Sequence, residues 1–201
     1  EVRSLADGVE RAHARGCAGW MDEGSAPTVD LPAVRRRCRS VAVGSAGAGR
    51  VGVVQLGPRW DCLAEAHTGA GEELAYLEAN ETVRAELDRW TLHPALLDVA
   101  TAFGRDRGSG SYLPMGYGRV LVRGALPRTF YSHLRYRDAG GDEVIAADLS
   151  LLDEAGHELV AISEFLLRRI DPDVVASSLH RVGDPAPGVA GHTAVGSGSA
   201  D

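Results

Sequence analysis

The stretch HPALLDVATAF, residues 93–103, decides the fold class of this chain. Pro94 stands near its start and Gly104 follows its end, which is the usual arrangement at the two ends of an α-helix. Its broad apolar surface is made by Leu96, Leu97, Ala100, Thr101 and Phe103. We therefore expect a mostly buried helix over residues 94–104.

The sequence around this helix predicts β-strands. Residues 130–137, 143–152 and 158–169 are rich in Val, Ile and Leu, and the segments DAGG and DEAG separate them. Asp and Gly supply the backbone conformations of tight turns, so these three runs predict an antiparallel meander. Shorter strands are predicted over residues 74–78 and 120–123. One buried helix wrapped by an antiparallel sheet is an α+β arrangement, the hotdog fold.

The two ends of the chain differ from this middle part. Residues 1–50 are expected to form a partly helical connector, with one short helix over residues 5–14 and another from the N-cap Asp30 to about Ser40. Residues 51–170 make up the expected hotdog domain. Residues 171–201 are expected to be a flexible C-terminal linker, because GDPAPGVAGHTAVGSGSAD lacks any apolar period.

Charge, cysteine content and hydropathy exclude several classes of function. A net charge of −7 disfavours a nucleic-acid-binding protein. Cys17, Cys38 and Cys62 occur without a C-x-x-C pair, so we expect free thiols and no bound metal. No run approaches the roughly 18 apolar residues of a membrane helix, and no signal peptide is visible. We expect a cytoplasmic protein.

Asp98 is the residue best suited to chemistry, because it interrupts the apolar run in the middle of the helix. Burial of a carboxyl group disfavours its charged form and raises its pKa. An acid of that kind donates a proton near neutral pH. The alternative, from spacing alone, is a partly exposed helical aspartate without a catalytic role.

The segments around Asp98 resemble the C-terminal half of polyketide synthase dehydratase domains. LHPALLD at 92–98 resembles the motif that opens the helix of that half, and LGPRWDCL at 56–63 is similar to the family's Y-G-P-x-F segment. YLPMGYGRVLV at 112–122 is similar to its L-P-x-x-x-x-x-V strand, and residues 148–170 resemble its closing hairpin. The variant DVATAF is closer to iterative, methylsalicylic-type synthases than to modular ones.

This resemblance implies half of a double hotdog that removes water from a β-hydroxyacyl chain. The chain is carried on the phosphopantetheine arm of an acyl carrier protein, and no other cofactor is implied. A histidine of the N-terminal hotdog would take the α-proton, while Asp98 would protonate the leaving hydroxyl. The implied partners are the carrier protein, the other domains of the synthase and a second copy of the synthase, in secondary metabolism such as antibiotic biosynthesis.

Five further residues are candidates for roles at the site. Trp60, Leu113 and Pro114 are expected at the substrate-binding site, and the alternative for Trp60 is an anchor in the hydrophobic core. His93 and Pro94 are expected to fix the start of the helix.

Three positions depart from the family pattern. The histidine motif H-x-x-x-G-x-x-x-x-P is absent, because His67 fits part of its spacing but Tyr76 occupies the proline position. The family's Gln or His four residues after the aspartate is Ala102 here, which cannot hydrogen-bond to the carboxyl group. Leu56, or Gln55 with a shift of one residue, stands in place of the family's tyrosine.

These departures leave three functions open. The chain is half of a dehydratase that receives its histidine from the other half, a thioester hydrolase that releases product from an iterative synthase, or an inactive dehydratase-like scaffold. A basic run also has two interpretations, a solvated helix face or a docking patch for an acidic carrier protein. It consists of Arg35, Arg36, Arg37 and Arg39.

Overall fold

The computed structural model describes residues 1–6, 8–20, 24–41, 43, 50–51, 54–55, 57–103, 111–137 and 143–171. The turn expected at 138–141 and all but the first residue of the expected linker lie outside these residues. In chain order the elements are β1 (Val2–Ala6), β2 (Val9–Ala14), α1 (Leu31–Arg37), β3 (Arg39–Val41), β4 (Arg50–Val51), β5 (Val54–Gln55), the 3₁₀ turn η1 (Pro58–Trp60), β6 (Leu63–Thr68), β7 (Glu72–Glu78), α2 (Glu81–Arg84), the 3₁₀ turn η2 (Leu87–Arg89), α3 (Pro94–Ala102), β8 (Ser111–Gly116), β9 (Arg119–Val122), β10 (Thr129–Arg137), β11 (Val144–Leu152) and β12 (Glu158–Ile170).

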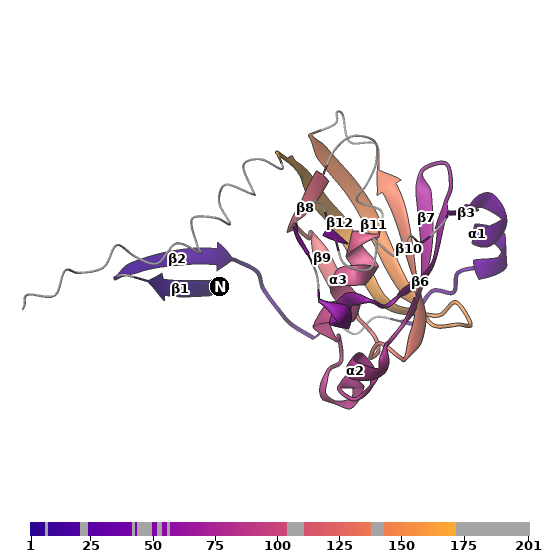
Figure 1. Ribbon diagram of the computed structural model, residues 1–201, viewed down its shortest axis with the longest axis horizontal. Helices are drawn as coiled ribbons and strands as arrows, with labels where there is room; N and C mark the ends of the chain where they lie inside the picture. Colours follow the sequence, from indigo (N-terminus) through magenta and orange to yellow (C-terminus); the bar gives the residue numbers. More distant parts are fainter. Residues whose placement is uncertain are drawn as a thin grey trace, which may run out of the picture.

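The main sheet of the molecule has eight strands (Figure 1). Its hydrogen-bonded order is β3-β6-β7-β10-β11-β12-β8, and β9 also pairs with β12. The predicted meander is confirmed, because β10 pairs antiparallel with β11 and β11 pairs antiparallel with β12. The turn between β11 and β12 forms as expected, with the Asp153 carboxyl group accepting the backbone N–H of Ala155 at 2.9 Å.

Helix α3 lies against one face of this sheet. Leu96 and Ala100 are fully buried and belong to the same hydrophobic cluster as Ala75 and Leu77 of β7. The hydroxyl of Ser132 in β10 donates to the backbone oxygen of Ala100 at 2.8 Å, a carbonyl in the last turn of the helix. The predicted arrangement of an antiparallel sheet around one helix is therefore confirmed.

Helix α1 covers the opposite face of the same sheet. Its buried residues Leu31 and Val34 form a second cluster with Leu74 of β7 and Leu152 of β11. Successive strand residues point to opposite faces, so Leu74 faces α1 while its neighbour Ala75 faces α3. The helix ends at Arg37 and not near Ser40, because the next residues pair with β6 as strand β3.

The segment before α1 belongs to the same packed unit as the main sheet and the two helices that cover it, because it is hydrogen-bonded to the turn between β11 and β12. The N–H of Val29 donates to the oxygen of Gly156 at 2.8 Å, and Thr28 forms an antiparallel bridge with His157. Gly156 has φ +86, and a Cβ there would lie 2.2 Å from the Val29 oxygen, so this turn requires glycine. The packed unit begins near residue 27, ahead of the boundary expected at Val51, because β3 is a strand of the sheet and α1 covers one of its faces.

The start of the chain forms a hairpin, so the helix expected over residues 5–14 is wrong. Strands β1 and β2 pair antiparallel, and every residue of β2 is exposed. Gly8, with φ +75, supplies the turn conformation, and the β-branched Val2 and Val9 favour extended backbone on either side of it. Figure 1 shows this hairpin apart from the main sheet.

Candidate functional site

Asp98 lies in the middle of α3, and a tryptophan fixes its carboxyl group. The indole Nε1 of Trp60 donates a hydrogen bond to Asp98 Oδ2 over 2.8 Å. Trp60 ends the turn η1, which begins at Pro58 and packs against the cluster around α3. Both side chains are partly exposed. The carboxyl group therefore lies at the edge of the core, and apolar side chains do not enclose it as we had expected from the sequence.

Trp60 donates to the side-chain carboxyl group of Asp98, whereas Thr101 and Ala102, which follow Asp98 on the helix, are placed differently. Thr101 is buried, and its hydroxyl donates to the backbone oxygen of Asp98 at 3.1 Å. Ala102, one helical turn after Asp98, has only a methyl group. The indole N–H reaches the carboxyl group from 38 residues earlier in the chain. Residue spacing gives no sign of this contact, because it depends on how η1 packs against α3.

A second polar chain joins η1 to the start of α3. The guanidinium of Arg59 is ion-paired with Glu86, and His93 Nε2 lies 3.2 Å from the same Glu86 oxygen. Arg59 first, and His93 second, hold the pKa of Glu86 below its ordinary value. His93 is buried and occupies the N-cap position directly before Pro94. His93 and Pro94 thus both lie where α3 begins.

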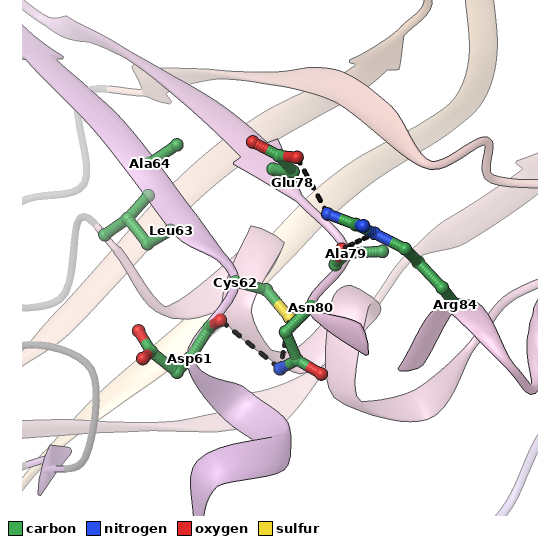
Figure 2. Close-up of a pocket in the computed structure, with 8 residues that line it drawn as sticks. All are labelled: Asp61, Cys62, Leu63, Ala64, Glu78, Ala79, Asn80 and Arg84. Atoms are coloured by element: carbon green, nitrogen blue, oxygen red, sulfur yellow. Dashed lines mark hydrogen bonds and ion pairs between the residues drawn. The ribbon is translucent and has the colours of Figure 1, made fainter. Parts of the chain in front are cut away.

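A shallow groove of about 310 Å³ opens beside η1 (Figure 2). It is lined by Asp61, Cys62, Leu63, Ala64, Glu78, Ala79, Asn80 and Arg84. The guanidinium of Arg84 donates to Glu78 Oε1 at 2.9 Å and to the backbone oxygen of Ala79 at 2.7 Å. Arg84 is thus part of the wall of the groove.

Two of the sequence's histidines lie on the far side of the sheet from Asp98. His67 in β6 and His133 in β10 are both paired with Leu74 of β7. Directly paired residues share one face of a sheet, and Leu74 packs under α1. Both imidazoles therefore lie on the α1 face, with the sheet between them and α3, and His67 does not belong to the site around Asp98.

On the α1 face, His133 takes part in a charged cluster. Glu72 accepts hydrogen bonds from Arg37 at 2.6 and 2.9 Å, and His133 Nε2 lies 2.8 Å from it. These partners, Arg37 above all, lower the pKa of Glu72 to about 2. Burial lowers the pKa of His133, although Glu72 opposes this effect. His133 is thus held by the Glu72 carboxylate on the α1 face.

The basic run on α1 is partly neutralised by neighbouring strands. Arg35 pairs with Glu65 at 2.7 Å, and Arg37 pairs with Glu72. Arg36 and Arg39 are exposed. A docking patch for an acidic carrier protein at this run stays a prediction.

Strand β8 carries the two remaining residues that the sequence assigned to substrate binding. Leu113 is partly exposed and pairs with Arg168 of β12, while Pro114 is exposed and pairs with Leu167. The β8 side chain that enters the hydrophobic cluster around α3 is their neighbour Tyr112. The motif in this segment drew attention to Leu113 and Pro114 and gave no role to Tyr112.

In the described part of the chain, no group of three or more His, Cys, Asp or Glu side chains is arranged to hold a metal ion. The three cysteines are unbridged, and burial raises the pKa of the Cys38 and Cys62 thiols. None of the helices that the structure describes has the length and apolarity needed to cross a bilayer.

Residues 26–177 match the family model described as "Polyketide synthase dehydratase N-terminal domain". This match begins next to residue 27, where the packed unit begins. The description names an N-terminal domain, so the expected assignment to the C-terminal half is not confirmed.

Solved dehydratase domains share the fold of this chain. An N-terminal dehydratase from the difficidin assembly line has a TM-score of 0.71 at 20% identity, covering 83% of this chain and 61% of that one. A trans-AT polyketide synthase dehydratase domain from Brevibacillus brevis has a TM-score of 0.65 at 24% identity, with coverages of 74% and 55%. The dehydratase domain of a mycocerosic acid synthase-like polyketide synthase has a TM-score of 0.66 at 25% identity, with coverages of 78% and 58%. These likenesses confirm the hotdog fold class, and the chain spans 55% to 61% of the length of these three structures.

Proposed function

Because the chain belongs to the polyketide synthase dehydratase family, we propose that it forms one hotdog of a dehydratase acting on a carrier-bound β-hydroxyacyl thioester. The observation that carries this proposal is the Trp60–Asp98 hydrogen bond, which holds a carboxyl group in a defined orientation on the central helix. The chain is shorter than the solved dehydratases, so the proposed active site also takes groups from a second hotdog.

In the proposed reaction, Asp98 acts as the general acid. Its carboxyl proton passes to the β-hydroxyl oxygen, the Cβ–O bond breaks, and a water molecule leaves. A base removes the proton from Cα, and the electron pair of that C–H bond forms the Cα=Cβ double bond. Protonation is needed because hydroxide is a poor leaving group. A histidine of the second hotdog is the proposed base, and phosphopantetheine carries the substrate.

The role proposed for Trp60 follows from the chemistry of the indole. An indole N–H is a donor only, whereas a carboxyl oxygen accepts a hydrogen bond in both of its protonation states. Trp60 therefore orients Asp98 without competing for its proton. This hydrogen bond supports a positioning role for Trp60, and the substrate-binding role expected from the sequence stays a prediction.

We propose that this hotdog is the C-terminal half of the double hotdog. The support is LHPALLD at the start of α3, together with the order of the three other segments that resemble that half. The description of the matching family model favours the opposite assignment. The sequence of the complete polypeptide decides between them: an H-x-x-x-G-x-x-x-x-P motif before residue 1 supports the C-terminal half, and a second hotdog after residue 201 refutes it.

The finer features of the proposal concern the surrounding synthase. DVATAF at 98–103 supports an iterative, methylsalicylic-type enzyme. The proposed partners are an acyl carrier protein, the other synthase domains and a second copy of the synthase. A cytoplasmic location and a role in secondary metabolism, such as antibiotic biosynthesis, stay predictions.

The proposed function is tested by identifying the product. The synthase protein that contains this chain is offered a β-hydroxyacyl thioester on a phosphopantetheinylated carrier protein, and the acyl group is analysed by mass spectrometry. We expect an enoyl thioester, one water lighter than the substrate. Free acid without an enoyl product would instead support the thioester hydrolase, and an unchanged substrate would support the inactive scaffold.

A further inference from the structure

The turn η1 depends on contacts from outside itself. It is three residues long, and the hydrogen bonds that close it run from Trp60 N to Gly57 O at 3.0 Å and from Asp61 N to Pro58 O at 3.1 Å. A 3₁₀ turn of this length has too few internal bonds to fix its own position. The direction of the Trp60 indole therefore depends on whatever anchors the backbone on each side of it.

The side-chain amide of Asn80 provides this anchor. Its Nδ2 lies 3.0 Å from the oxygen of Pro58 and 3.3 Å from the oxygens of Arg59 and Asp61. It also lies 3.3 Å from the sulfur of Cys62, a buried residue two positions after the end of the turn. Figure 2 shows the amide directed at Asp61 and Cys62. The two amide hydrogens are thus shared among acceptors that flank Trp60 on both sides.

Asn80 is itself held firmly. Its Oδ1 accepts the N–H of Val83 at 3.1 Å and so caps the N-terminus of α2. The two residues before it belong to the end of the sheet, where Glu78 N donates to Cys62 O at 2.9 Å and Ala79 N donates to Arg128 O at 2.8 Å. The amide therefore uses its oxygen for α2 and its nitrogen for η1, on a rigid base.

We propose that Asn80 is a positioning residue that holds the Trp60 indole on the carboxyl group of Asp98. Asn80 acts through the backbone of η1 and has no part in the proton transfer. The positional claim stands on the contacts alone, and its effect on catalysis rests on the function proposed for Asp98.

Two substitutions separate this role from the helix cap. Asn80→Asp and Asn80→Ser both keep an oxygen that caps α2. Asn80→Asp replaces the amide donor with an acceptor that faces carbonyl oxygens. Asn80→Ser also removes the donor, because its side chain is too short to span the turn, and it adds no charge. If either variant fails to fold, judged by circular dichroism, the other still tests the proposal.

The indole N–H signals of the 201-residue chain report the outcome without any activity. The chain has three tryptophans, and Trp60→Phe identifies the signal of Trp60 in a ¹H–¹⁵N spectrum. Trp20 is fully exposed and marks the position of a solvated indole. We expect the Trp60 signal of the Asn80 variants to move towards that of Trp20 and to lose its response to Asp98→Asn. A Trp60 signal that stays at its original position, and still responds to Asp98→Asn, overturns the proposal.

The catalytic consequence is measured separately in the synthase. A misdirected acid lowers kcat by up to about tenfold, no more than the loss of the indole N–H itself, while KM stays within about twofold, because substrate binding does not use Asn80. An unchanged kcat in variants whose Trp60 signal has moved would overturn the catalytic part of the proposal. A synthase with no dehydratase activity would refute the proposed function, whereas the indole spectra still decide the position of Asn80.

Discussion

The indole of Trp60 donates its N–H to Oδ2 of Asp98 over 2.8 Å, and so joins a short turn to the central helix. The contact supplies the carboxyl group with a polar partner that Ala102 cannot provide. The effect of losing the Trp60 donor therefore depends on whether residue 102 can donate to Asp98, although nothing in their spacing along the chain connects the two positions. Exchanging the donor between these two positions tests that link.

Trp60→Phe is expected to lower the dehydration rate about tenfold and to leave KM nearly unchanged. The ring still packs against the core, but the hydrogen bond, worth about 1.4 kcal/mol, is lost. Adding Ala102→Gln should restore part of the rate, because a glutamine one turn after Asp98 presents an N–H to the same carboxyl group. Rates of enoyl formation for the single and double variants check this.

Trp90→Phe is the matched control, because it is the same substitution at a tryptophan that is about half exposed and whose ring meets the edge of His93. It should keep nearly the full rate. A double variant no faster than Trp60→Phe alone would contradict the compensation between positions 60 and 102.

Glu72→Gln is expected to destabilise the fold in a pH-dependent way. The folded chain lowers the pKa of Glu72 from 4.5 to about 2, so the unfolded chain binds this proton more readily. The stabilisation is fully present above about pH 4.5 and is lost as the pH falls through about 2. At pH 7 we expect a loss of about 1–2 kcal/mol, since Arg37 is half exposed and its pairing is screened. Urea unfolding at several pH values measures this difference.

Glu65→Gln gives the control for this experiment. Glu65 of β6 makes an ion pair with Arg35, which lies on α1 as Arg37 does. Both side chains are well exposed, so the loss of unfolding free energy should stay below about 0.5 kcal/mol. An equal loss in both variants, or a Glu72→Gln effect that does not diminish in acid, would argue against the pairing described for Glu72.

Two deletions test where the packed unit begins. Removing residues 1–20 should leave the unfolding free energy of the remainder almost unchanged, because the described residues of this segment are exposed. Removing residues 1–50 also takes away Leu31 and Val34 of α1 and Cys38 at its end, which are buried against Leu74 and Leu152 of the sheet. That loss is on the order of 5 kcal/mol. Equal stability of the two shortened chains would restore the boundary at Val51.

The parts of the fold that the sequence predicted are those set by local patterns. Pro94 and the apolar run after it predicted α3, and the Asp153–Gly156 turn between two apolar runs predicted the β11–β12 hairpin. The hairpin at the start of the chain was mistaken for a helix, since its strands alternate weakly and their pairing depends on the Gly8 turn. The pairing of the segment before α1 was not predicted, because its contact with Gly156 is tertiary.

The candidate site shows the same division. The motif around Asp98 identified the residue and its helix, since both lie within one short segment. Its hydrogen-bond partner could not be predicted, because Trp60 reaches it only after η1 packs on α3. Asn80 gave no signal in the sequence for the same reason: its amide acts on a turn some twenty residues earlier.

The role of Asp98 is tested most directly by the rate of enoyl formation in the Asp98→Asn synthase, compared with the unaltered protein. The amide oxygen of asparagine still accepts the Trp60 N–H, so the geometry is kept and only the acidic proton is lost. Loss of a general acid predicts a fall in kcat of about 10²- to 10⁴-fold. An unchanged rate of water loss in Asp98→Asn would contradict the assignment of Asp98 as the acid.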